Sequence, residues 1–304
     1  MAVLHTTLGP LGTDEVGLVL PHEHLLVDFR LPDEVPPDAL DRDAVVAVMA
    51  PALRAAGDAG VTVVVECTPH GLGRRAELLA AVSRAAGVPV VLATGVYREP
   101  WVPRWVYDAS DADLEAFVAG ELTDGVDGTD VPAGFVKVSA GDAGLQPVEE
   151  RILRAAARAA VRTGALVGSH TTDGRVVLRQ LDVVAEEGLA PDRFLSIHTQ
   201  AVADAGLRQA IVDRGAWIEY DHVGQGDDAD VLALVLASLD AGHEEQLLLS
   251  HDAGWFDPAL PGGGAQRPFT TLPMSFLPAL RAAGVEEDTV VLLTRRNPFA
   301  AFAR

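Results

Sequence analysis

The chain has almost no cysteine: Cys67 is the only one among 304 residues, so no disulfide can form within it. Scarce cysteine is typical of proteins from a reducing compartment. The chain also has no run of eighteen apolar residues, and it does not begin with a basic segment followed by an apolar stretch. We therefore expect no membrane-spanning helix, no signal peptide and a cytoplasmic location. Cys67 ends the apolar run VTVVVEC, which predicts a buried, inert thiol.

Basic residues are few as well. The chain has 23 lysines and arginines against 44 aspartates and glutamates, which gives a formal net charge of -21. A surface of this sign repels the phosphate backbone of nucleic acids and the headgroups of an anionic membrane. We expect neither as a partner, and we interpret the acidity as that of a solvated surface. A small-molecule substrate is the partner we expect.

Eight short runs rich in β-branched residues recur along the chain, and 49% of all residues are hydrophobic. Between most of these runs lie Ala-, Leu- and Arg-rich stretches with helical spacing. Two of these stretches, Asp43–Gly60 and Val148–Gly164, end at a glycine suited to a helix C-terminus. Alternation of strands and helices predicts parallel βα units. The predicted strands are Gly17–Pro21, Val61–Cys67, Pro89–Thr94, Gly134–Val138, Ala165–Gly168, Phe194–Ile197, Trp217–Tyr220 and Gln246–Leu249.

Eight such units predict an α/β fold of the (β/α)8 TIM-barrel type, which typically uses about 250 residues. A doubly wound open sheet is the alternative, but the glycine-rich phosphate loop that usually follows its first strand is absent. No linker divides the chain, so residues 1–304 are predicted to form one domain. The flexible stretch Pro261–Pro268 is interpreted as a loop over the barrel mouth. Residues 1–15 precede the first strand and are expected to cover part of the barrel.

Polar residues occur where the predicted strands end, and in such barrels the chemistry lies at the carboxyl ends of the strands. Each has an ordinary structural explanation when taken alone. A histidine after a strand is usually a hydrogen-bonded structural residue, a lysine can extend its amine outward, and an aspartate can cap a helix. The six residues are His22, His24, Lys137, His170, His198 and Asp252.

Taken together, these residues predict a metal centre. Burying that many polar groups at the mouth of the barrel would cost free energy, and bound metal ions are the simplest way to offset this cost. Four histidines and one aspartate could fill two metal sites, but a ligand must bridge them. Burial favours the neutral form of a lysine amine, which can react with carbon dioxide to form a carbamate. Lys137, as a carbamate, would supply an anionic bidentate ligand.

The ordered set of these residues resembles the phosphotriesterase family of the amidohydrolase superfamily, which includes phosphotriesterase-like lactonases. The resemblance covers nearly the whole chain. It begins at GPLGTDEVGLVLPHEHLL, continues through GVTVVVECTPHGLGR, GVYREP, GFVKVSAG and GSHTTDG, and ends at LLLSHDAGW and RRNPFAAFA. The succession of His-x-His, Lys, His, His and Asp, each at its own strand end, is specific to this family.

The resemblance implies an amidohydrolase-type barrel with two divalent metal ions and a hydroxide between them as the nucleophile. His22 and His24 with Asp252 would bind the more buried ion, and His170 with His198 the more exposed one. Carbamylated Lys137 would bridge both ions, and Asp252 would accept the proton of the hydroxide. Zinc is the first expectation for the metal, with cobalt, manganese and iron as alternatives. The family also makes a homodimer an expectation.

Two further positions and one departure bear on catalysis. Tyr97 in GVYREP resembles a lactonase tyrosine that lies near the hydroxide, and a packed core tyrosine is the alternative. His222 in EYDHVGQ resembles a proton-shuttling histidine of the phosphotriesterase branch, where many lactonase-like members have arginine. A substrate-pocket or surface histidine is the alternative. In HTQAVAD, Ala201 stands where the carboxylate partner of that shuttle is expected, and Asp204 lies three residues further on.

The resulting hypothesis is a binuclear metal-dependent hydrolase of ester bonds, acting first on a lactone or carboxylic ester. A phosphotriester is the second substrate class, and an amide or carbamate stays open, because the same nucleophile can attack each of them. A non-catalytic ligand-binding barrel is a further alternative, which the loss of a metal ligand would favour, but none of the six positions is missing. A mononuclear deaminase-like enzyme would not need Lys137.

Overall fold

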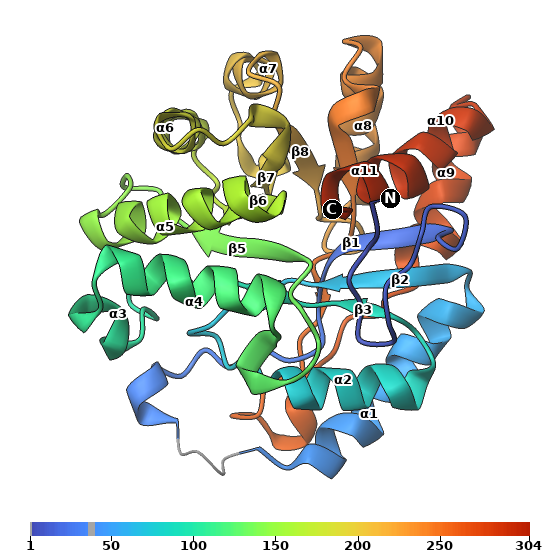
Figure 1. Ribbon diagram of the computed structural model, residues 1–304. Helices are drawn as coiled ribbons and strands as arrows, with labels where there is room; N and C mark the ends of the chain where they lie inside the picture. Colours follow the sequence, from blue (N-terminus) through green and yellow to red (C-terminus); the bar gives the residue numbers. More distant parts are fainter. Residues whose placement is uncertain (1, 36–39) are drawn as a thin grey trace.

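Parallel strands curl into a barrel at the centre of the molecule, and helices surround it (Figure 1). The computed structural model describes residues 2–35 and 40–304. Every named pair of neighbouring strands is parallel. The strands are β1 (Leu18–His24), β2 (Val61–Glu66), β3 (Val90–Val91), β4 (Ala93–Thr94), β5 (Phe135–Ser139), β6 (Val167–His170), β7 (Phe194–Ile197), β8 (Trp217–Tyr220), β9 (Leu247–Leu249) and β10 (Ala253–Gly254).

These segments occupy eight positions around the barrel. The hydrogen-bonded orders are β10-β1-β2-β3 and β4-β5-β6-β7-β8-β9. Because only Leu92 separates β3 from β4, the two pieces form the third position. Only residues 250–252 separate β9 from β10, so these two pieces form the eighth position. β10 pairs with β1 through Glu23 and Ala253. The eighth position therefore closes on the first, which confirms the (β/α)8 TIM barrel and rules out the open sheet.

The first strand extends further than the sequence pattern predicts, which ended it at Pro21. Leu20 pairs with Val64, and the next pair is Glu23 with Glu66, so three steps on β1 match two on β2. This irregularity is a β-bulge, and a bulge tolerates proline because one residue stays unpaired there. The strand continues through the His-x-His motif, and the two histidines point to the same face.

Helices follow most strands and cover the outside of the barrel (Figure 1). The second predicted helix ends as expected, because Gly164 adopts a left-handed conformation at φ 73° after α5. No helix among the described residues is long and apolar enough to cross a membrane. The helices are α1 (Arg42–Asp58), α2 (Ala76–Ala86), α3 (Arg104–Asp108), α4 (Asp111–Thr123), α5 (Pro147–Thr163), α6 (Gly174–Glu186), α7 (Ala205–Asp213), α8 (Asp228–Asp240), α9 (Leu277–Ala282), α10 (Glu287–Val291) and α11 (Asn297–Phe302).

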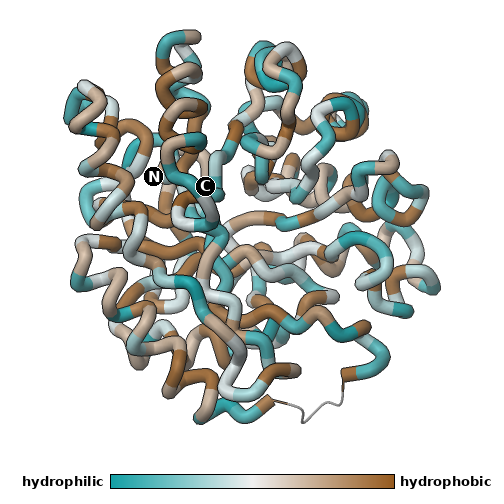
Figure 2. Tube along the Cα trace, turned by 180° about the vertical axis from the view of Figure 1, so that it is seen from behind, coloured by the Kyte–Doolittle hydropathy of each residue, from teal (hydrophilic) through white to brown (hydrophobic). Residues whose placement is uncertain are grey.

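Apolar side chains pack on both sides of the barrel wall, as expected for a parallel sheet covered by helices. The hydropathy colouring in Figure 2 shows apolar and polar residues alternating along the outer helices. Both chain ends lie together in Figure 1, where Val3 and Arg304 exchange backbone hydrogen bonds of 3.0 and 3.2 Å. Leu4 and Phe302 join the apolar cluster inside the barrel. The N-terminal segment therefore covers part of the barrel, as predicted.

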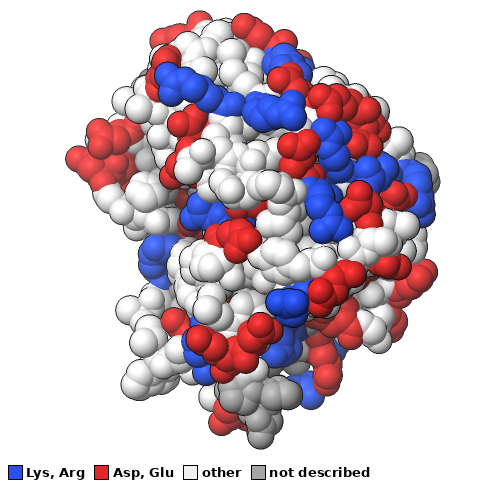
Figure 3. Space-filling model, turned by 90° about the vertical axis from the view of Figure 1, so that its left-hand side faces the viewer, with Lys and Arg blue, Asp and Glu red and all other residues white. Residues whose placement is uncertain are grey.

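Charged side chains of both signs meet on the outer helices. Arg154 on α5 forms ion pairs with Glu150 and Glu187, and Arg158 pairs with Glu115 on α4. Figure 3 shows basic side chains lying among acidic ones on this side of the molecule. Arginine is therefore paired with carboxylates wherever the helices bring the two together, although acidic residues outnumber basic ones.

Candidate metal centre

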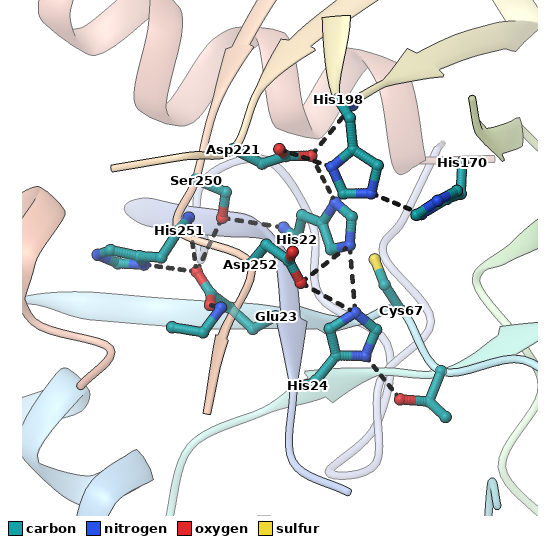
Figure 4. A network of polar contacts seen from close by, with 12 residues as sticks. His22, Glu23, His24, Cys67, His170, His198, Asp221, Ser250, His251 and Asp252 are labelled. Atoms are coloured by element: carbon teal, nitrogen blue, oxygen red, sulfur yellow. Dashed lines mark hydrogen bonds and ion pairs between the residues drawn. The ribbon is translucent and has the colours of Figure 1, made fainter. Parts of the chain in front are cut away.

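Four of the six predicted ligands converge inside the barrel around His22. The Nε2 atom of His22 lies 3.3 Å from Nε2 of His24 and 3.3 Å from Nζ of Lys137. Oδ1 of Asp252 lies 3.2 Å from Nε2 of His24 and 3.8 Å from Nε2 of His22. His22, His24 and Asp252 offer ligand atoms that all lie within 4.8 Å of one another (Figure 4). This group has the geometry of a first metal site.

The other two predicted ligands form a second group beside the first. Nε2 of His198 lies 2.7 Å from Nδ1 of His170, and the ring of His198 lies 5.1 Å from that of His22. His198 follows β7 in a left-handed conformation at φ 60°, and Asp252 adopts one at φ 50°. Such conformations are strained in residues other than glycine and cluster at functional sites. The structure thus brings all six predicted residues to one end of the barrel.

A carboxylate that the sequence did not single out holds two of the rings. Asp221, directly after β8, lies 2.9 Å from Nδ1 of His22 and 2.8 Å from Nδ1 of His198 through its two oxygens (Figure 4). Oγ1 of Thr68 lies 2.7 Å from Nδ1 of His24. These partners assign the ring proton to Nδ1, so that Nε2 of each ring presents its lone pair to the centre. Histidines that bind metals are commonly oriented in this way.

Asp221 also belongs to a group of three residues that could itself hold a cation, together with His22 and His198. Its distances to both rings are those of ordinary hydrogen bonds. The amide Nε2 of Gln200 donates to the same carboxylate at 2.6 Å, and Oε2 of Glu219 lies 2.9 Å from Nδ1 of His22. We therefore assign Asp221 as the hydrogen-bond acceptor that orients the two rings.

Electrostatics favours the protonation states that metal binding requires. Burial, followed by the charge of Lys137, lowers the pKa of His22 to about 3, and burial and His198 lower the pKa of His170. Burial alone would raise the pKa of Asp252, but its close contact with His24 and the nearby His22 lower it. The rings of His22 and His170 are therefore neutral and the carboxylate is ionised at neutral pH. Neutral imidazole and carboxylate are the forms that bind metal ions.

This donor set fits divalent metal ions. Three nitrogen atoms of His22, His24 and Lys137 crowd together at 3.3 Å, and Asp252 provides the nearest anionic oxygen. Nitrogen lone pairs that face one another need a positive charge between them, and a cation supplies it. Nitrogen and oxygen ligands in this combination suit zinc and the neighbouring transition metals. The described residues can therefore hold metal ions here without any rearrangement of the fold.

A second buried network fixes the backbone between the ligands. The carboxylate of Glu23, which lies between the two histidines of β1, accepts from Oγ of Ser250 at 2.8 Å and from the backbone N–H of Ala253 at 2.8 Å. Nδ1 of His251 lies 2.5 Å from the same carboxylate. Figure 4 shows His251 on the side of Glu23 that faces away from His22 and His24. The network ties β1 to the segment that carries Asp252.

A small cavity of about 50 Å³ opens over the cluster. Apolar and aromatic side chains make up most of its wall, which is typical of sites for small molecules. The rings of Phe29 and Trp255 lie 5.4 Å apart on that wall. The lining residues are His24, Val27, Phe29, Cys67, Leu72, Tyr97, Lys137, His170, His198, Asp252 and Trp255.

The two further predicted positions lie differently. Tyr97 is buried in the cavity wall, its ring is 5.5 Å from that of His170, and burial raises its pKa. His222 is exposed and is not among the residues that line the cavity. Asp204 does not replace the carboxylate missing at Ala201, because its side chain caps α7 by accepting from Gly206 N–H at 2.8 Å. The structure thus brings Tyr97, but not His222, to the cavity.

The barrel carries histidines, a carboxylate and a buried lysine at the carboxyl ends of its parallel strands. This combination is typical of the class of metal-dependent TIM-barrel enzymes. The model of the phosphotriesterase family matches residues 2–302 of this sequence. The chain belongs to the phosphotriesterase family. The family resemblance noted in the sequence is thereby confirmed.

Individual relatives agree with this membership. The phosphotriesterase homology protein of Mycobacterium tuberculosis is 30% identical over 322 residues, which cover 100% of this chain and 98% of the relative. A triple mutant of the organophosphorus hydrolase from Deinococcus radiodurans has a TM-score of 0.86 at 27% identity and covers 98% of this chain and 97% of its own. A structure described as organophosphate hydrolysis engineered from a weak promiscuous lactonase template has a TM-score of 0.87 at 28% identity, with 99% of each chain covered.

Proposed function

We propose that the protein is a binuclear metal-dependent hydrolase whose first substrate class is a lactone or carboxylic ester. The observation that carries this proposal is the convergence of the two ligand groups on a buried lysine. Nζ of Lys137 lies 3.3 Å from Nε2 of His22, and the side chain lines the same cavity as His170 and His198. A group at this position can reach both sites. Family membership supports hydrolysis as the reaction class.

In this proposal His22, His24 and Asp252 hold one ion, and His170 with His198 hold the other. Lys137, once carbamylated, would supply the anionic oxygen ligand between the two groups. Zinc is the first expectation, because nitrogen and carboxylate-type ligands suit it, with cobalt, manganese and iron as alternatives. When bound, such ions polarise the carbonyl oxygen of the substrate and lower the pKa of water.

The chain's own residues then move the protons. Asp252 is ionised, because its pKa is lowered, and its Oδ1 faces the ligand cluster, so it can accept the proton of the attacking water. It can return this proton to the leaving alkoxide when the ring of a lactone opens. Tyr97 borders His170 with its hydroxyl protonated at neutral pH, so it can donate a hydrogen bond to the reacting group. His222 is not required, which agrees with its exposure.

The apolar wall of the cavity binds the rest of the substrate. Phe29, Tyr97 and Trp255 present aromatic surface above the ligand cluster. Burial of apolar surface against such a wall contributes roughly 25 cal/mol per Å². A lactone or ester with an apolar substituent fits this environment and leaves its carbonyl toward the cluster.

A phosphotriester is the second candidate, because a neighbour of the same fold at 27% identity is named an organophosphorus hydrolase. Its phosphoryl oxygen would take the place of the carbonyl oxygen. An amide or carbamate needs stronger protonation of its leaving group, for which Asp252 and Tyr97 are the groups at hand.

Metal analysis and a substrate panel test the proposal together. Protein purified without chelator should contain close to two metal equivalents and should hydrolyse at least one of a panel of lactones, aryl esters and paraoxon. The Asp252→Asn variant serves as the control for contaminating hydrolases and should be inactive on that substrate. Full activity with one equivalent would contradict the binuclear centre. Two tightly bound equivalents without activity on any member would favour a non-catalytic ligand-binding barrel.

A further inference from the structure

One arginine near the cavity has no carboxylate partner among the described residues, although its side chain contacts Tyr97. Arg98 follows Tyr97 directly after β4, and its guanidinium carbon lies 5.9 Å from the centre of the Tyr97 ring. Its positive charge is close enough to His170 to be one of the causes that lower the pKa of that ring. The residue is half-buried and lies next to the lining residue Tyr97, without lining the cavity itself.

Neighbouring carboxylates are engaged elsewhere. Among the residues that the structure describes, none forms an ion pair with Arg98, and the Nε–H of Arg98 is buried without a hydrogen-bond acceptor. Glu99 accepts from the hydroxyl of Tyr107 at 2.5 Å, and Asp142 accepts from the hydroxyl of Thr172 at 2.5 Å. A buried donor without an acceptor is costly, and native proteins keep few of them.

Other arginines near the cavity are already in use. Arg30 forms an ion pair with Asp28 at 2.7 Å. Arg267 stacks over Trp255 at 5.0 Å and donates to the backbone carbonyl of Asp252, so it supports the loop after β10. Arg98 therefore carries a charge that no carboxylate pairs within the described part of the chain, in a protein whose formal net charge is -21. Among the same residues Arg267 also lacks an ion pair and has a buried Nε–H without an acceptor, but its guanidinium is held by Trp255 and by the carbonyl of Asp252.

We propose that Arg98 binds an anionic group of the substrate, a carboxylate or sulfonate held a few atoms from the scissile bond. This inference rests on the proposed hydrolase function and narrows its substrate class to anionic esters, lactones or amides. The guanidinium presents parallel N–H groups that match the two oxygens of such an anion. The anion would supply the acceptor that the Nε–H lacks.

The chain offers a way to occupy Arg98 without changing it. Nη1 of Arg98 lies 3.6 Å from the position that a Cβ atom would take on Gly141, whose backbone conformation accepts a side chain. A carboxylate placed there by Gly141→Asp would reach the guanidinium and compete with the substrate anion. Gly141→Ala fills the same space without charge and is the matched control.

The test compares two substrates that differ only in the anion, mono-(4-nitrophenyl) adipate and its methyl ester, on metal-replete enzyme. The wild type is expected to prefer the acid at least about tenfold in kcat/KM, since a charge-assisted hydrogen bond is stronger than a neutral one. Arg98→Met and Gly141→Asp should abolish this preference, and Gly141→Ala should keep it. Equal preference in the wild type and in Arg98→Met would overturn the proposal, as would equal losses in the two Gly141 variants.

A binding measurement separates this inference from the hydrolase assignment. Butane-1-sulfonate is titrated into each protein and followed by tryptophan fluorescence, because Trp101 lies 5.8 Å from Tyr97 and Trp255 lines the cavity. If neither ester is hydrolysed, the proposed function fails, and the titration decides the role of Arg98 alone. Weaker sulfonate binding in Arg98→Met, with Gly141→Ala unaffected, supports the anion site. Equal binding in the wild type and in Arg98→Met contradicts it.

Discussion

The amine of Lys137 lies 3.3 Å from Nε2 of His22 in the centre of the barrel. Lys137 is the only lysine of the chain, so the other 22 basic residues are arginines. It is also 2% exposed, and among the described residues it forms no ion pair with a carboxylate. A single lysine at the one place where a carbamate would complete a metal centre makes this residue the critical element of the proposed function. It also makes every lysine-directed measurement specific for this site.

Replacement of Lys137 should disrupt both metal sites. We expect Lys137→Ala to lose metal and activity, because the proposed bridging ligand between the two groups is removed. Short carboxylic acids such as propionate should restore part of both by bridging the ions in its place. Elemental analysis and hydrolysis rates with and without propionate measure the effect. An alanine variant with full activity would rule out the bridging role.

The hydrogen bonds of Asp221 should control metal affinity. An asparagine at this position has only one acceptor oxygen, so Asp221→Asn cannot accept from both His22 and His198. Loss of a residue that accepts a hydrogen bond from a metal-binding histidine typically weakens metal affinity by about 10–100-fold. Chelator competition measures this affinity. Asp204→Asn is the control, because Asp204 caps α7 and its replacement should leave metal affinity intact; equal losses in the two variants would contradict the orienting role of Asp221.

His222 and Asp252 should differ strongly in their importance for turnover. We expect His222→Asn to lower turnover on a lactone by roughly tenfold or less, because the ring is exposed and Asp252 can return the proton itself. Asp252→Asn should cost about a hundredfold or more, because it removes a ligand together with the proton acceptor. Turnover and metal content of both variants decide the matter. If the His222 variant keeps both metals and is as inactive as the Asp252 variant, His222 is an essential shuttle.

An ion pair between a buried arginine and a partly exposed aspartate, remote from the centre, should make stability depend on pH. Arg74 is fully buried and pairs with Asp127 and Glu121 at 2.6 Å each. Burial alone would raise the pKa of Asp127, but the charge of Arg74 and its hydrogen bond lower it below 3.8. When the pKa of a carboxylate is lower in the folded than in the unfolded protein, its charge stabilises the fold at every pH above the unfolded-state pKa. This contribution is lost as the pH falls through the folded-state pKa.

The corresponding variant tests this dependence. We expect Asp127→Asn to lower the free energy of unfolding at pH 7 by about 1–3 kcal/mol, because Arg74 loses a charged acceptor. Urea denaturation from pH 7 to pH 2 measures the difference between the wild type and the variant. The difference should shrink below pH 3.8, and one that stays constant down to pH 2 would show that Asp127 does not stabilise through its charge.

Local signals in the sequence were sufficient for the barrel and for the six residues that gather at one end of it. The strands that end at Tyr220 and Ile197 match their predicted ranges, because β-branched runs bounded by polar residues are local features. The continuation of β1 past Pro21 was missed, because a bulge is set by pairing with β2 rather than by the strand itself. The histidines could nevertheless be placed, because residues i and i+2 share a face in a strand.

The hydrogen-bond partners of the clustered histidines could not be predicted in the same way. Asp221 and Thr68 lie far from the histidines in sequence, and only the closed barrel brings their oxygens to the Nδ1 atoms. The arginine beside Tyr97 has no signal of its own, because an unpaired cation is recognised only when its surroundings are known. Exposure of His222 was also beyond the sequence, since strand ends place residues at the rim without fixing whether they face the cavity.

Carbon NMR of protein equilibrated with ¹³C-bicarbonate tests the central claim most directly. Because Lys137 is the only lysine, the wild type with two metal equivalents should show one slowly exchanging carbamate signal per chain. Lys137→Ala should lack this signal and keep only the weak, rapidly exchanging one of an α-amino group. An active wild-type enzyme with two bound metals and no signal beyond that of Lys137→Ala would contradict the carbamate-bridged centre.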